Sequence, residues 1–170
     1  TGVRQNASGD RLEAHFAQAN VTGLRTSSGD ADQIQSAVLD GHVMLVQEPA
    51  PKPGANPQPP MHATAGKAIY EGAGEWLHLQ ESPRVENGAM QLAADKIDIS
   101  QQTGDAFAHG NVKGTWLDEK KTGQPDHAAN HTSLSIGGNG PTHVGAQEAH
   151  IERTTDQATF KGNARLWQQD

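Results

Sequence analysis

The fold is decided by one stretch, Ala94-Asp-Lys-Ile-Asp-Ile99 followed, after a polar turn, by Ala106-Phe-Ala-His-Gly-Asn-Val112. Apolar and polar residues alternate along its first run and in part of its second, which predicts two half-buried strands joined by a turn. The Gly-Asn pair near the end predicts a corner that breaks the second strand. The stretch is therefore expected to form a strand–turn–strand unit with a corner.

The same phrase occurs again between Ala146 and Ala164. In both copies sixteen positions separate the first alanine from the corner glycine, which is Gly110 or Gly162. Weaker echoes occur at Ala65–Tyr70 for the strand and at Leu39–Val43 for the corner. A repeated unit of this kind predicts a sandwich, barrel or stacked β-architecture.

The rest of the chain fits an all-β fold in a single domain, residues 1–170. Its 19 glycines and 9 prolines are typical of a turn-rich β-protein. A proline-rich loop is expected at 48–60 and a polar loop at 118–132. Asp40-Gly41 is a hairpin-type dipeptide, and the apolar run after it is expected to be buried on both faces. Further strands are expected at 11–16 (with helix as the alternative), 19–24, 34–39, 42–47, 76–80 and 133–136.

Composition excludes several classes of function. The chain has no cysteine, so disulfides and thiolate chemistry are absent, and it has no apolar run of the length that crosses a membrane. A net charge of −7 with scattered Lys and Arg argues against a nucleic-acid surface. The chain starts at Thr1, and we expect a mature or trimmed form whose signal or anchor is not in this sequence.

A family resemblance is carried by Leu79-Gln-Glu-Ser-Pro-Arg-Val85, Asn87-Gly88, Ala94-Asp-Lys-Ile97 and Gly110-Asn-Val112, in that order. The chain resembles the OstA-like family of bacterial lipopolysaccharide-transport proteins, which includes LptA, LptC and the amino-terminal domain of LptD. The resemblance covers most of residues 30–167. It implies a non-enzymatic protein with no cofactor, located in the periplasm.

The resemblance also implies an open, twisted β-jellyroll in which two facing antiparallel sheets form a slot for acyl chains. The implied ligand is lipopolysaccharide or a related amphipathic lipid. The implied partners are other β-jellyroll transport proteins joined by edge-strand pairing, including a head-to-tail homo-oligomer. Apolar residues in phase along the expected strands are the slot candidates: Leu77, Leu79, Ile97, Ile99, Phe107, Val112, Leu134, Ile136, Ile151, Phe160 and Leu166. Lys96 and Asp98 are expected to face water.

Several residues are also compatible with other functions. His127 and His131 beside Asp126 have metal-ligand spacing, but they lie in an expected loop without a second motif. The sequence has no nucleophile elbow and no phosphate loop, and paired carboxylates such as Asp95 and Asp98 lie three strand positions apart, so they would point to opposite faces. Neither a metal site nor an enzyme is therefore expected. The alternative function is a structural or carbohydrate-binding β-sandwich without a lipid slot. In this alternative the sugar platform would consist of Trp76, Trp116 and Trp167. In the lipid-slot interpretation, the candidates for binding phosphate groups at the slot rim are Arg84, Lys96, Lys113 and Arg165.

Overall fold

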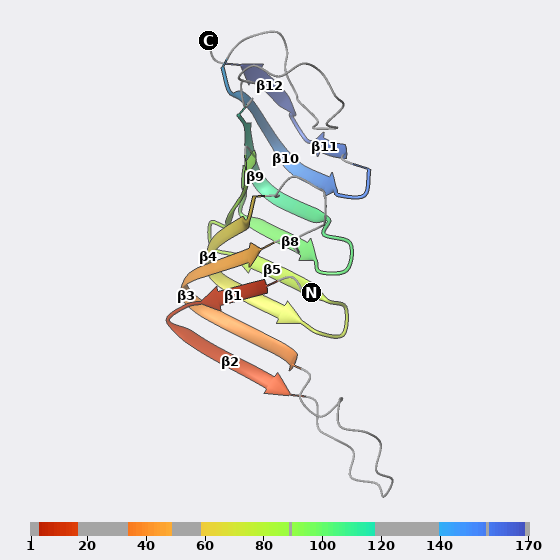
Figure 1. The fold of residues 1–170 in the computed structure, drawn as a ribbon. Coiled ribbons are helices and arrows are strands. Elements are labelled where there is room, and N and C mark those ends of the chain that lie inside the picture. The colour runs from red at the N-terminus through yellow and green to blue at the C-terminus, as the bar shows by residue number, and fades with distance from the viewer. Residues whose placement is uncertain are drawn as a thin grey trace, which may run out of the picture.

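The protein is all-β, as the sequence predicts, and its strands form one large antiparallel sheet. The computed structural model describes residues 4–16, 34–48, 59–88, 90–117, 140–155 and 157–168, and these residues form no helix. Within these residues the sheet has twelve strands and a β-jellyroll-like form (Figure 1). The strands are β1 (Arg4–Ser8), β2 (Arg11–Phe16), β3 (Ile34–Glu48), β4 (Met61–Glu71), β5 (Trp76–Gln80), β6 (Arg84–Asn87), β7 (Met90–Ala93), β8 (Lys96–Ser100), β9 (Ala106–Trp116), β10 (Thr142–Glu152), β11 (Gln157–Lys161) and β12 (Arg165–Gln168).

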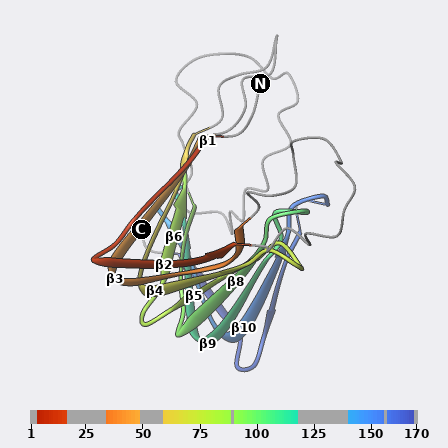
Figure 2. The ribbon, with the colours of Figure 1, turned by 90° about the horizontal axis from the view of Figure 1, so that it is seen from below.

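The sheet is folded into two arms that share their longest strands. β3, β4, β9 and β10 each pair with one set of short strands at one end and another set at the other end. The first arm runs in the order β2-β3-β4-β5-β8-β9-β10-β11, and the second in the order β1-β3-β4-β6-β7-β9-β10-β12. Figure 2 shows the two arms diverging from a shared line of corners. The described residues therefore form an open V with eight strands in each arm.

Four equivalent corners separate the two arms. At each corner two consecutive residues adopt a left-handed backbone, the region that favours glycine. The carbonyl of the first one accepts a hydrogen bond of 2.9–3.0 Å from a backbone N–H of the facing segment. Such a bulge bends the strand and increases its twist. The left-handed pairs are Gly41-His42, Glu81-Ser82, Gly110-Asn111 and Gly162-Asn163, and the facing donors are Asp10, Gly66, Asp95 and Gln147.

Glycine is needed at these corners because a side chain lies over it. At Gly110 an added Cβ would collide with the carboxylate of Asp95, which also accepts a hydrogen bond of 2.9 Å from Asn111 Nδ2. Gly41 and Gly162 have the same relation to their facing residues. One corner reverses the roles, because Glu81 is left-handed there and its side chain covers Gly66. The predicted corner and its repeat are thus confirmed.

Most predicted strands are present, and two details of the prediction were wrong. Arg11–Phe16 is a strand and not a helix. Asp40-Gly41 does not end a hairpin, because β3 continues through it and stays paired with β4 on both sides of the bulge. The following run is not buried on both faces, since Met44 is 52% exposed on the outer side of the second arm. The predicted strands 19–24 and 133–136, the loop 118–132 and residues 49–58 of the proline-rich loop lie outside the described residues.

Within the described residues, no helix has the length and hydropathy needed to cross a membrane.

Candidate functional site

The inner face of the V carries the apolar residues of both arms. Because directly paired residues of antiparallel strands point to the same face, the registers define rows that cross all eight strands. One row of the first arm runs Leu12–Leu39–Ala68–Leu79–Ile97–Ala108–Ala149–Phe160. The next row runs Ala14–Ala37–Tyr70–Leu77–Ile99–Ala106–Ile151–Ala158. The facing row of the second arm runs Ala7–Leu45–Ala63–Val85–Leu92–Gly114–Val144–Leu166.

The interior is closed in the middle of the molecule. Leu79, Ile97 and Ala108 are 0% exposed, and they belong to one apolar cluster with residues of both arms. Near the C-terminal end the arms meet in an edge-to-face contact between Trp116 and Phe160, with ring centroids 5.8 Å apart. The middle therefore has the character of a protein core and not of an empty channel.

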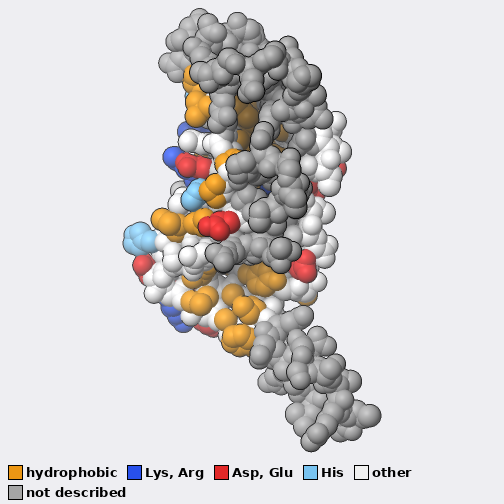
Figure 3. Space-filling model, viewed as in Figure 1, with side chains coloured by type: hydrophobic (Ala, Val, Ile, Leu, Met, Phe, Trp, Pro, Cys, Tyr) orange, Lys and Arg blue, Asp and Glu red, His pale blue; other side chains and the backbone are white. Residues whose placement is uncertain are grey.

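The interior opens towards both ends of the strand order. Leu12, in the same row as Leu79, is 64% exposed, and hydrophobic side chains gather over β2 and β3 in Figure 3. At the other end Leu166 is 40% exposed. An open recess of about 170 Å³ lies there between the inner faces of the two arms. Its lining is Val144, Ala158, Phe160, Ala164, Arg165 and Leu166.

Eight of the eleven predicted slot residues lie on this inner face. Leu79, Ile97, Ile99 and Val112 are buried in the cluster, and Leu77, Ile151 and Phe160 pack against it. Leu166 lines the recess with Phe160. Leu134 and Ile136 lie outside the described residues.

Phe107 was predicted for the wrong face. It pairs with Asp98, while Ile97 pairs with Ala108, so Phe107 points outwards and the two isoleucines point inwards. The turn at 100–105 sets this register, and its length alone did not determine which of the alternating residues would face inwards. Phe107 instead lies against His150, with stacked rings 4.2 Å apart, and against Trp76 at 5.9 Å.

A charged network on the outer face of the first arm was missed. Asp98 was expected to face water, but its side chain is only 14% exposed. Its carboxylate lies 2.5 Å from His78 Nδ1, 3.0 Å from Lys96 Nζ and 3.7 Å from His109 Nε2. The other ring nitrogen of His78 lies 3.7 Å from Glu71. Cross-strand pairing of His78 with Asp98 brings this network together, and alternation alone does not reveal it.

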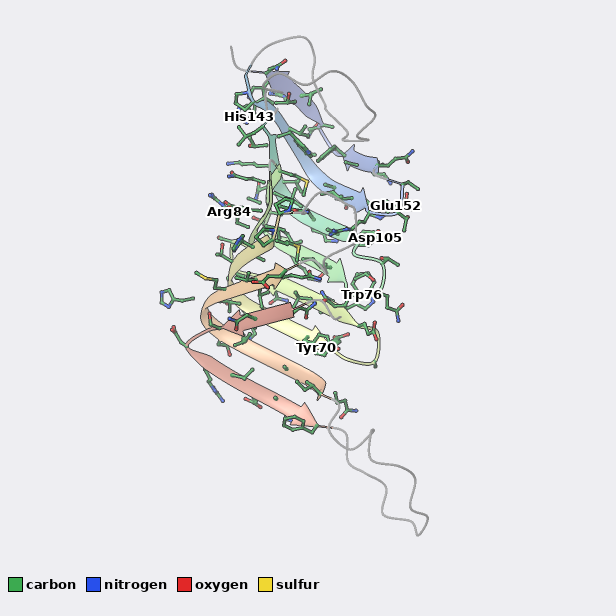
Figure 4. All side chains as sticks on the ribbon, in the orientation of Figure 1. Tyr70, Trp76, Arg84, Asp105, His143 and Glu152 are labelled. Carbon is green, nitrogen blue, oxygen red and sulfur yellow. The ribbon has the colours of Figure 1, made fainter. Side chains whose placement is uncertain are left out.

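The tryptophans do not form one platform. Trp76 lies on the outer face of the first arm beside His78, whereas Trp116 points into the interior. Trp167 lies on the outer face of the second arm, opposite His143. In Figure 4 His143 and Arg84 project from the opposite side of the molecule to Tyr70, Trp76, Asp105 and Glu152.

The basic residues are also placed differently from the prediction. Arg84, Lys113 and Arg165 belong to one outer row of the second arm, separated by Ala93 and Gly145. This row runs beside the corners and not along the open rim of the V. Lys96 lies on the outer face of the first arm, where it pairs with Asp98.

Two exposed groups have shifted pKa values, and both are explained by hydrogen bonds. The Asp10 carboxylate, 2.8 Å from His42 Nδ1, raises the pKa of that histidine. The backbone N–H of Arg153 and the Thr103 side chain lower the pKa of Asp105, with a smaller contribution from His150. Neither group belongs to the interior. The described residues contain no cluster of His, Asp or Glu that could hold a metal ion, and His127 and His131 lie outside them.

The chain matches no protein-family model and no curated protein. The interior, its two open ends and the outer clusters are therefore the basis for any functional conclusion.

Proposed function

We propose that the chain is an OstA-like, non-enzymatic carrier of the periplasm that shields the acyl chains of lipopolysaccharide or a related amphipathic lipid. The observation that carries this proposal is the apolar inner face, which continues unbroken along the strand order and opens at both ends. Each methylene group moved from water onto such a surface contributes roughly 0.8 kcal/mol. Binding therefore needs no catalytic or cationic group.

The recess at the C-terminal end is the first place where an acyl chain would bind. Phe160 and Leu166 face each other there from the two arms. With about 170 Å³, the recess is smaller than the roughly 300–1,000 Å³ of a site for a drug-sized ligand, so it suits part of an acyl chain. A chain that runs deeper would require the arms to part at the contact between Trp116 and Phe160.

The ends of the sheet favour head-to-tail assembly with another β-jellyroll. In the part of the chain that the structure describes, each arm has eight strands and every pairing is antiparallel, so the first and last strands of an arm run in opposite directions. A second copy placed in the same orientation would therefore set its β2 antiparallel to β11, and its β1 antiparallel to β12. Unpaired edge strands bind partners in this way, and stacking of this kind would join the interiors end to end.

A structural β-module with a solid core is the second candidate. The complete burial of Leu79 and Ile97 in the middle favours it. The two candidates differ in what they predict for the recess, because a carrier should bind lipid there and a structural module should not.

Photocrosslinking separates the two candidates. A photoreactive residue at Phe160 faces the recess, and the matched control at its exposed neighbour Lys161 faces outwards. With purified lipopolysaccharide, we expect crosslinks from position 160 and none from 161. Leu166→Asp should remove these crosslinks and leave the fold intact, since Leu166 is already partly exposed. Equal labelling from both positions, or none from 160 in a folded protein, would refute the carrier.

A further inference from the structure

The outer face of the second arm carries an exposed indole beside two cations, at the end formed by β9, β10 and β12. Trp167 is 47% exposed, and one face of its ring stacks on His143 with centroids 5.6 Å apart. The indole lies across Gly145, close enough that a Cβ on this residue would be in van der Waals contact with the ring at 3.5–3.6 Å. The ring is thus held on one side and accessible on the other.

Lys113 and Arg165 flank the same glycine. Both are cross-strand partners of Gly145, so they stand on either side of it, about 10 Å apart at their backbones. Both side chains are exposed. Among the described residues neither forms an ion pair, whereas Arg11, Lys67 and Lys96 each do. In a chain of net charge −7, two cations without a carboxylate partner favour an anionic ligand.

Two hydrogen-bonding side chains, His143 and Thr115, complete the cluster. His143 Nδ1 lies 3.1 Å from Thr115 Oγ1, so a ligand hydroxyl would meet the other ring nitrogen. These two residues are cross-strand partners in the row that ends at Trp167. The surface therefore offers a flat apolar face, a polar patch and a positive rim within one small area of a rigid sheet.

We propose that Trp167, His143, Lys113 and Arg165 form a binding site for a sugar ring that carries a phosphate group. The apolar face of the ring packs on the free side of the indole. The phosphate binds Lys113 and Arg165 at the edge of the indole, because Arg and Lys make charge-assisted hydrogen bonds with phosphate oxygens. His143 and Thr115 bind ring hydroxyls. The site lies on the outer face, so it does not depend on the proposed uptake of lipid by the interior.

Indole N–H signals in a heteronuclear NMR titration test this site, with each signal assigned by a Trp→Phe variant. Glucose 1-phosphate should shift the Trp167 signal and leave that of Trp116, which points into the interior, unchanged. Glucose and inorganic phosphate should each bind at least about tenfold more weakly, since each lacks one half of the interaction. Lys113→Gln and Arg165→Gln should each weaken glucose 1-phosphate binding about tenfold.

Lys161→Gln is the matched control, because Lys161 is exposed on a neighbouring edge strand and has no partner role in the cluster. It should bind like the wild type. Trp167→Ala, checked for folding by its thermal transition, should lose binding. Equal affinity for inorganic phosphate would show a simple anion site and overturn the sugar proposal. No shift with glucose 1-phosphate, or a Trp167 shift only with anionic phospholipid vesicles, would overturn it as well.

Discussion

The middle and the ends of the molecule contain the same apolar rows in opposite environments. Leu79 and Leu12 belong to one row and point to one face, yet the first is 0% and the second 64% exposed. The difference comes from strand order, since β5 has paired neighbours on both sides and β2 has one. Alternation therefore determines which face a side chain occupies, and position in the sheet determines whether that face is covered.

The corners are nevertheless alike from end to end. The bulge hydrogen bond at the N-terminal corner, Asp10 to Gly41, has the same 2.9 Å length as the one in the middle, Asp95 to Gly110. The last corner, Gln147 to Gly162, also measures 2.9 Å. The ends thus have the same corner geometry as the middle and differ in how far their inner face is covered.

The largest expected difference between the middle and the ends is in the unfolding free energy lost when a charged residue replaces an apolar one in the same row. Ile97→Asp places a carboxylate where no polar partner is available, so we expect a loss of more than about 4 kcal/mol of unfolding free energy. Leu12→Asp, the matched change at the exposed end of the row, should cost about 1 kcal/mol or less. Urea denaturation measures both. Similar losses for the two variants would contradict the closed middle.

The sequence predicted the β-class, the repeated unit and the corners because these depend on local chemistry. Gly110-Asn111 has the residue types that tolerate a left-handed backbone, and its spacing recurs at Gly162. Leu77 and Leu79 could be assigned to a face because a strand alternates with period two.

Features that depend on register between strands could not be predicted. Phe107 was predicted to point inwards with Ile97, but its register relative to Ile97 is set by the intervening turn. A shift of one residue in that register exchanges the two faces, and the sequence alone does not fix it. The Asp98 network and the cluster at Trp167 each combine residues from several strands. Asp40-Gly41 resembles a hairpin turn locally, and only the continued pairing of β3 with β4 shows it to be a bulge.

Replacing a corner glycine by alanine should also cost more stability in the middle of the molecule than at an end, but the difference should be smaller. Gly110→Ala forces a Cβ into a backbone of φ +75° and displaces the Asp95 carboxylate from Asn111, so we expect a loss of about 2 kcal/mol. Gly162→Ala meets the same backbone requirement between the edge strands β11 and β12. We expect it to loosen that end locally and to lower the global transition by less. Hydrogen exchange with urea denaturation distinguishes local from global opening, and equal global losses would count against independent opening of the end.

The smallest expected effect is a pH dependence at the N-terminal corner that the middle corner lacks. His42 occupies the position of Asn111, and each bonds the carboxylate of its facing aspartate. Since Asp10 raises the pKa of His42 in the folded state, this contact stabilises the fold below the ordinary histidine pKa of about 6.5. The contribution disappears as the pH rises through the higher pKa of the folded state.

His42→Asn, which copies the middle corner, should remove this dependence while keeping the left-handed backbone. Its size should be small because His42 is fully exposed, so NMR titration of the imidazole is the suitable measurement, with Asp10→Asn as control. An unchanged His42 pKa in Asp10→Asn would show that the pair does not couple, and that the N-terminal corner is held by its backbone hydrogen bonds alone.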